Sequence, residues 1–162
     1  MTIQIGQPLP DIEITVVETG AEVQRSSTAA LFAEGKSVLF AVPGAFTPTC
    51  SERHMPGYVK HFHEFQARGI KLYCMAVNDA YVMQAWAASQ QVPPGFKLLA
   101  DGNGAFTSAL GLQMDGTAYG MGMRARRFAL YAENGVVKLL NLESPGELRV
   151  TTAETMLAAV DA

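Results

Sequence analysis

VPGAFTPTCSERHMPGY, residues 42–58, contains three prolines, two glycines, two threonines and one of the two cysteines of the chain. It follows directly on the apolar run SVLFAV (residues 37–42), which is typical of a strand buried on both faces. A cysteine that serves packing is expected in a strand or on the buried side of a helix. Cys50 instead stands in a proline-rich turn, and we interpret it as placed for chemistry.

Pro48 indicates how this turn is built. Proline is well tolerated at the first position of a helix, so Thr47 is expected to be the N-cap and Cys50 to lie third in the first turn. Ligand sites of open α/β sheets gather at this carboxyl end of a strand. The free N–H groups and the helix dipole favour a thiolate there, and the Thr47 hydroxyl can reach the sulfur or its target. The alternative for Cys50 is a small buried hydrophobe in a tight turn.

Strands and helices alternate along the chain. Strand-like patterns are found at residues 12–18, 21–25, 37–42, 70–78, 96–101 and in a hairpin over 127–143 around Asn134-Gly135. Helical patterns are found at residues 26–35, from 48 to 68 with Pro56 as a kink or interruption, and at 79–91, 104–111 and 151–160. The pattern predicts one α/β domain over residues 1–162, with a central mixed sheet flanked by helices.

Composition excludes several classes of protein. The 162 residues are 49% hydrophobic and 17% charged, which is typical of a globular chain. A net charge of −3 argues against a nucleic-acid surface. No apolar run approaches the roughly 20 residues of a membrane span. The N-terminal MTIQIGQPLP lacks the features of a signal peptide, so we expect a cytoplasmic protein.

The two cysteines, Cys50 and Cys74, are 24 positions apart and form no C-x-x-C pair. Cys50 with His54, His61 and His63 could be imagined as a zinc site, but a tetrahedral site needs tighter, paired spacing. We therefore expect no metal. Cys74 lies within the strand-like KLYCMAV and is interpreted as a core residue, with a disulfide to Cys50 as the alternative.

The loop PGAFTPTC resembles the active-site loop of the peroxiredoxins, whose pattern Pro-x-x-x-Thr/Ser-x-x-Cys falls on Pro43, Thr47 and Cys50. Its longer form is similar to the peroxiredoxin-5 (type II) subfamily. The resemblance continues through MAVNDAYVMQAW, LLADGNGAFTSALGL and GMGMRARRFALYAENGVVKLLNLE. It implies a thioredoxin-like fold and a cysteine peroxidase without a cofactor. Cys50 would attack a hydroperoxide and become a sulfenic acid, Thr47 would hold the peroxide and Pro43 would shield the sulfur.

The resemblance also implies a catalytic arginine from a later strand. Arg124, Arg126 and Arg127 compete for this role in MRARRFALY. The family places the arginine directly before the aromatic residue, which selects Arg127. Neighbouring strand residues point to opposite faces, so Arg126 is expected to point away from what Arg127 touches. Arg127 would stabilise the thiolate and donate hydrogen bonds to the peroxide.

His54, four residues after Cys50, raises the alternative of acyl-transfer chemistry by a Cys-His pair. No orienting acid or oxyanion-hole motif is evident, so we interpret His54 as a polar residue beside the site. Met121 and Met123 are expected near the rim of the site or at a subunit interface. Phe46 is either a core plug or an interface aromatic. The resemblance favours a homodimer.

Part of the subfamily carries a second, resolving cysteine near the C-terminus, but LESPGELRVTTAETML contains none. A sulfenic acid on Cys50 would therefore need an external thiol, from glutathione with glutaredoxin or from thioredoxin. The expected activity is the reduction of hydrogen peroxide and small alkyl hydroperoxides in antioxidant defence. A redox sensor or chaperone, and a non-catalytic thioredoxin-fold domain, are the alternatives. Sustained peroxide consumption would separate the peroxidase from the sensor or chaperone, and an unperturbed thiol at Cys50 would support the non-catalytic domain.

Overall fold

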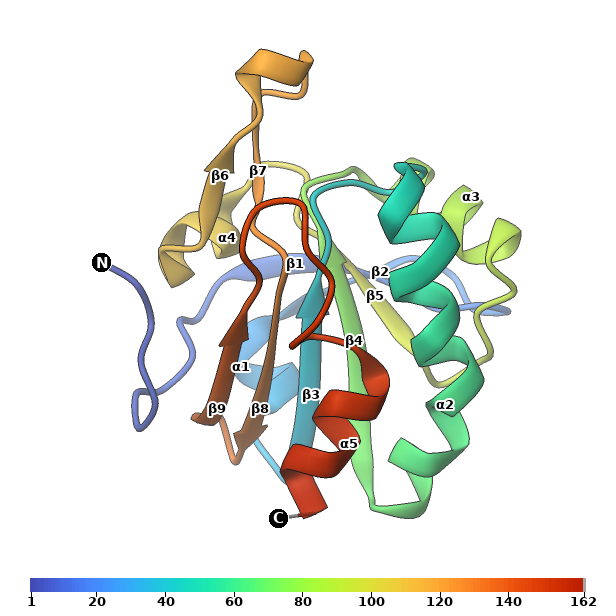
Figure 1. The fold of residues 1–162 in the computed structure, drawn as a ribbon. Helices are drawn as coiled ribbons and strands as arrows, with labels where there is room; N and C mark the ends of the chain where they lie inside the picture. The colour runs from blue at the N-terminus through green and yellow to red at the C-terminus, as the bar shows by residue number, and fades with distance from the viewer. Residues whose placement is uncertain (162) are drawn as a thin grey trace.

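The computed structural model describes residues 1–161 and is built around a seven-stranded mixed sheet (Figure 1). The strands lie in the order β2-β1-β5-β4-β3-β8-β9. Their bounds are β1 Glu13–Val17, β2 Gln24–Ser27, β3 Lys36–Ala41, β4 Ile70–Ala76, β5 Lys97–Ala100, β8 Phe128–Glu133 and β9 Val136–Leu142. The three central strands β3, β4 and β5 are parallel, and the outer ones pair antiparallel. The predicted mixed sheet is confirmed.

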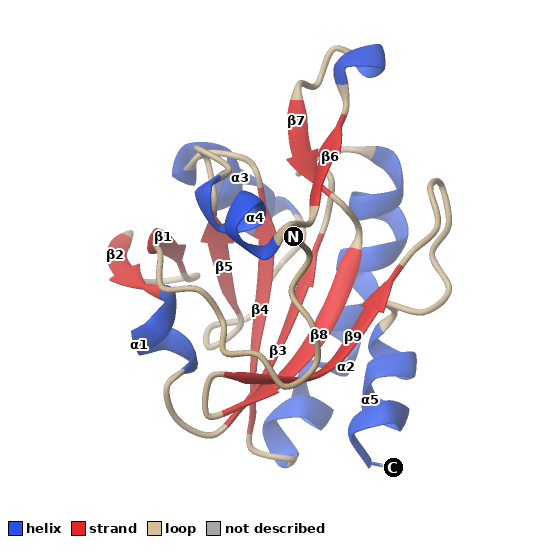
Figure 2. Cartoon of the chain, turned by 90° about the vertical axis from the view of Figure 1, so that its left-hand side faces the viewer, coloured by secondary structure: helices blue, strands red, loops and turns tan. Residues whose placement is uncertain are grey.

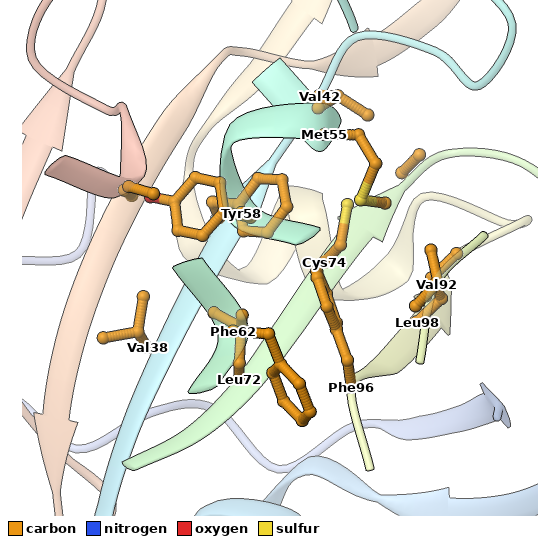
Figure 3. Close-up of a cluster of buried hydrophobic side chains, with 14 of the residues drawn as sticks. Val38, Val42, Met55, Tyr58, Phe62, Leu72, Cys74, Val92, Phe96 and Leu98 are labelled. Atoms are coloured by element: carbon orange, nitrogen blue, oxygen red, sulfur yellow. The ribbon is translucent and has the colours of Figure 1, made fainter. Parts of the chain in front are cut away.

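Helices cover both faces of the sheet (Figure 2). Their bounds are α1 Thr28–Phe32, α2 Met55–Ala67, α3 Ala80–Ser89, α4 Ala105–Leu110 and α5 Ala153–Asp161. One buried cluster joins the sheet to α2, α3 and α5, and a second joins it to α1 and α4. Figure 3 shows the first cluster, in which the Phe40 ring of β3 stacks on Tyr58 of α2 at 3.7 Å between centroids. The continuously apolar central strands are thus explained, because both of their faces are buried.

Pro56 interrupts the long helix, as predicted. The backbone N–H of Met55 donates to the Cys50 carbonyl, five residues back, in a π-helical turn η1 over Cys50–His54. Proline has no N–H and its ring clashes with the carbonyl four residues earlier, so the wider turn admits it at the start of α2. The interruption lies one turn from the cysteine, and π-turns of this kind are frequent at functional sites.

Two predictions of secondary structure were incomplete. The second strand of the N-terminal hairpin is Gln24–Ser27, not 21–25, because the connecting loop is longer than Thr19-Gly20 alone. The segment between α4 and β8 forms a hairpin, β6 Gln113–Asp115 and β7 Met123–Ala125, with the 3-10 turn η2 Thr117–Tyr119 at its tip. This hairpin projects from the end of the molecule at which β3 leads into α2 (Figure 1). The hairpin was not predicted because strands of three residues are too short to show an alternation of apolar and polar residues.

No helix within residues 1–161 is long and apolar enough to cross a membrane.

Candidate active site

Cys50 lies in the first turn of the helix that follows β3, where the sequence placed it. The helix begins at Pro48, and the Thr47 carbonyl accepts the first helical bond from Ser51 N–H at 3.0 Å. Cys50 is the third helical residue and its side chain is completely buried. The Thr47 hydroxyl donates to the Gly44 carbonyl at 2.6 Å, which leaves its oxygen lone pairs free to accept a hydrogen bond from a ligand.

The loop before Cys50 is held on both sides. Asn78 Oδ1, after β4, accepts the Ala45 N–H at 2.9 Å. Arg124 of β7 donates to the Pro43 carbonyl at 3.4 Å and fills the space beside Gly44, where a Cβ would lie 2.8 Å from its Nη1. A side chain at position 44 would therefore displace the end of Arg124 from this contact. Although the sequence set Arg124 aside as a catalytic candidate, the structure places it as a tie between the projecting hairpin and the loop.

Phe46 is not a core plug. Its φ is +65° and its side chain is 54% exposed, so the tight turn directs the ring into solvent.

Arg127 connects Cys50 to the start of β8. Its Nη2 donates to Cys50 Sγ at 3.1 Å, and its Nη1 lies 2.6 Å from His54 Nδ1. A guanidinium has fixed donors and no acceptor, so both contacts are donations from Arg127. Among the described residues, Arg127 is the arginine that donates to the sulfur. Arg127 therefore places a cation and a directed N–H against the sulfur.

His54 is a buried neutral acceptor for Arg127. Its Nε2 lies 2.9 Å from the Thr151 carbonyl, which can only accept, so Nε2 carries the proton and Nδ1 is free to accept from Arg127. Burial, and then the neighbouring Arg127 charge, lower the pKa of His54 to about 3, against weaker opposing effects of Thr151 and Glu143. His54 is thus confirmed as a polar neighbour, and a neutral one.

The depressed pKa of His54 predicts a pH dependence of stability. Its ordinary pKa is about 6.5 in an unfolded chain, so between pH 6.5 and about 3 the unfolded state binds the extra proton. The free energy of unfolding should therefore fall as the pH falls through this window, by at most about 1.4 kcal/mol per pH unit from this residue. Urea unfolding of the wild type and His54→Gln should give curves of stability against pH that converge on acidification. Parallel curves would contradict the assignment.

Cys74 belongs to the core, as predicted. It lies in β4 and is fully buried, and both cysteines are free (Figure 3). Burial, with a smaller effect of Cys50, raises the pKa of the Cys74 thiol well above its ordinary value. Such a thiol is inert as a nucleophile. Of the imagined zinc ligands, His61 contacts Glu64 and Glu154 instead, and residues 1–161 bring no three His, Cys, Asp or Glu side chains together that could hold a metal ion.

A cavity of about 490 Å³ opens beside this site. It is bordered by the loop before Cys50, by the projecting hairpin, and by the segment that connects β9 to α5. Its apolar lining includes Pro43, Met114, Tyr119, Met121 and Pro145. Met121 is therefore a rim residue, as expected. Thr47 and Arg127 also line the cavity. Arg126 lines it too, so the expectation that it points away was wrong: residues 126–127 lie between β7 and β8, where strand alternation does not apply.

The structure brings the four residues selected from the sequence into one place. Pro43, Thr47 and Arg127 line one cavity, and Arg127 contacts Cys50. The sequence did not find Glu143 and Thr151, which complete the surroundings of His54. The Thr151 carbonyl is the partner of His54, and Glu143 binds Thr151 through its N–H and its hydroxyl. Glu143 ends the predicted hairpin and Thr151 begins the last helical pattern, both far from Cys50 in the sequence, and neither pattern indicates a contact with the site.

Comparisons with known proteins agree with this geometry. The redoxin family model matches residues 4–157. The chain is 43% identical to Peroxiredoxin-2E, chloroplastic, of Arabidopsis thaliana, over 98% of this chain and 70% of that protein. It is 42% identical to Peroxiredoxin-2C of Oryza sativa subsp. japonica, over 98% of each. The structure of reduced Prx3 from Vibrio vulnificus in complex with hydrogen peroxide superimposes with a TM-score of 0.90 at 45% identity, covering 99% of this chain and 97% of that one.

These matches show that the chain belongs to the redoxin family and, within it, to the peroxiredoxins, which are thiol peroxidases. The resemblance noted in the sequence and the thioredoxin-like fold are confirmed.

Proposed function

We propose that this peroxiredoxin works by a one-cysteine mechanism in which Cys50 reduces hydrogen peroxide and small alkyl hydroperoxides. The observation that carries the proposal is the 3.1 Å contact between Arg127 Nη2 and Cys50 Sγ, beside a cavity that Arg127 also lines. An arginine so placed can stabilise a thiolate before the reaction and the departing oxygen during it.

The reaction balances with the groups present and one external reductant. The Cys50 thiolate attacks the terminal oxygen of R–O–OH, the S–O bond forms as the O–O bond breaks, and the alkoxide takes up a proton as ROH or water. Sulfur is oxidised by two electrons to the sulfenic acid, and the peroxide is reduced by two electrons. A thiol then displaces water to give a mixed disulfide, and a second thiol releases Cys50.

Thr47 and Pro43 fit supporting roles in this reaction. The Thr47 hydroxyl already donates to Gly44, so it can accept the O–H of a bound hydroperoxide. Pro43 lines the cavity beside the buried sulfur and would help to keep bulk water from it. The apolar part of the cavity wall suits a short alkyl group R, which the leaving oxygen of the hydroperoxide carries.

The reductant is proposed to be an external thiol, glutathione with glutaredoxin or thioredoxin. Cys74 is the sole other cysteine of the chain, and it is buried in a central strand. Its thiol cannot reach a partner without local unfolding. Resolution by an outside thiol also limits further oxidation of the sulfenic acid to the sulfinic state.

A turnover experiment tests this function. The reduced protein is mixed with one equivalent of hydrogen peroxide and a sulfenate-trapping reagent, and mass spectrometry locates the label. We expect rapid labelling of Cys50 and steady peroxide consumption once glutathione with glutaredoxin, or thioredoxin with its reductase, is added. Labelling without turnover under both reductants would instead favour a redox sensor or chaperone. No labelling within minutes would contradict a reactive Cys50.

We also propose a homodimer formed near the site. Exposed apolar side chains gather at this end of the molecule: Phe46 is 54% exposed, Tyr119 81% and Met123 55%. Patches of this kind mark interaction surfaces. Analytical ultracentrifugation of the reduced protein at micromolar concentration should give twice the 17.4 kDa mass of the chain. A monomer under these conditions would contradict the dimer.

A further inference from the structure

Glu143 is a buried residue in the segment between β9 and α5, and its carboxylate binds an unusually large number of donors. Its side chain accepts four hydrogen bonds on one oxygen, Oε2. The donors are the backbone N–H groups of Arg149, Val150 and Thr151, at 2.8–2.9 Å, and the Thr151 hydroxyl at 2.7 Å. Burial alone would raise the pKa of Glu143, but the Thr151 hydroxyl and the three N–H donors outweigh it and lower that pKa. Glu143 is therefore ionised at neutral pH.

These bonds hold the backbone N–H and the side chain of Thr151, whose carbonyl belongs to the next peptide group. With its N–H and hydroxyl both held by Glu143, Thr151 directs its carbonyl into the core. This carbonyl accepts the Tyr58 hydroxyl at 2.7 Å and the His54 Nε2–H at 2.9 Å. The first contact anchors it to α2, and the second selects the tautomer of His54.

The tautomer of His54 determines whether a lone pair or an N–H faces Arg127. With the proton on Nε2, His54 presents a lone pair on Nδ1 to Arg127 Nη1 at 2.6 Å. The opposite tautomer would place an N–H against an N–H and turn the guanidinium away. When Nη1 is fixed, Nη2 of the same planar group is fixed as well, 3.1 Å from Cys50 Sγ. The Glu143 N–H also donates to the Arg127 carbonyl at 3.0 Å, although this bond does not need the carboxylate.

We propose that Glu143 is a positioning residue of the peroxidase, which sets Arg127 against the Cys50 sulfur through Thr151 and His54. Glu143 also lines the cavity, but its carboxylate oxygen Oε2 is occupied by residues 149–151 and no hydrogen bond joins it to the Cys50 sulfur. Removing its carboxylate leaves three N–H groups and a hydroxyl without their acceptor, and the two donors of Thr151 are buried, so residues 149–151 rearrange and the Thr151 carbonyl moves. His54 then loses the partner that holds its tautomer. The inference rests on the roles proposed above for Cys50 and Arg127.

The test is a double-mutant cycle between Glu143 and His54 on the full chain. Stopped-flow mixing with hydrogen peroxide gives the second-order rate constant, with the emission of Trp86 as signal. The Nε1–H of this single tryptophan donates to Ser51 Oγ at 2.9 Å, next to Cys50.

Glu143→Ala should lower the rate constant about tenfold or more. Glu143→Gln retains an oxygen at the position of Oε2 and should stay within about threefold of the wild type. The matched control is Glu154→Ala, an exposed glutamate at the start of α5.

The His54 background separates positioning from a general loss of structure. The His54→Leu variant has already lost the hydrogen bonds through which Thr151 orients Arg127. Adding Glu143→Ala to it should therefore lower the rate constant less than twofold further. Equal losses in both backgrounds, or a wild-type rate in Glu143→Ala, would overturn the inference. If Glu143→Ala does not fold, the same cycle is measured with Glu143→Gln, whose smaller loss should likewise vanish beside His54→Leu. A wild-type protein that does not react with peroxide would instead overturn the proposed function.

Discussion

Peroxide consumption should stop when Cys50 is replaced by serine. A serine hydroxyl does not ionise in the pH range where a thiol does, so the nucleophile is lost while the shape of the turn is kept. We expect the rate to fall by at least about three orders of magnitude. The measurement is the consumption of hydrogen peroxide under excess thiol reductant, followed by a colorimetric peroxide assay.

Cys74→Ser is the matched control, because it makes the same chemical change in the other cysteine. It should keep most of the activity and lose stability instead, by about 1–3 kcal/mol, since a hydroxyl enters an apolar core. Urea unfolding and the peroxide assay on the same samples separate the two effects. Equal loss of activity in both variants, with Cys74→Ser still folded, would show that Cys74 takes part in the cycle.

The sequence was most informative where the residue pattern is local. The apolar strands, the proline at the first helical position and the Asn-Gly turn are each determined within a few residues, and the structure contains all three. In the turn, Asn134 and Gly135 have φ values of +51° and +80°, as the tight hairpin requires. Cys50 in the first helical turn follows from the same local reasoning. The family motif then added Pro43, Thr47 and Arg127, which lie at one cavity.

The remaining parts of the site depend on contacts between distant residues. His54 is 73 positions from Arg127 and 97 from Thr151, and nothing in their neighbourhoods predicts that they meet. Glu143 reads as the polar end of a strand until its carboxylate is seen to bind a turn six to eight residues later. The projecting hairpin was missed for a different reason: three-residue strands among glycines have too few positions to show alternation.

Arg127→Ala should slow the attack on peroxide by about 10²–10³-fold, the loss typical of one directed donor in a catalytic site. Cys50 Sγ loses its N–H donor and nearby cation, and the departing oxygen loses the cation that would stabilise its charge. Arg127→Lys keeps the charge but not the planar pair of donors that reaches His54 and Cys50 together, so it should recover only part of the rate. Stopped-flow rate constants for hydrogen peroxide measure each variant.

Arg126→Ala provides the comparison, because it removes the same side chain one position earlier. Arg126 borders the cavity, whereas the donation to the sulfur comes from Arg127, so the Arg126 variant should lose much less of the rate. The size of the difference decides between two explanations. A positive potential over the cavity would make both arginines matter similarly and would weaken with added salt. A directed hydrogen bond would make Arg127 dominate at every ionic strength. The 3.1 Å contact predicts the second outcome, and a larger loss in Arg126→Ala would show that the wrong arginine has been assigned to the sulfur.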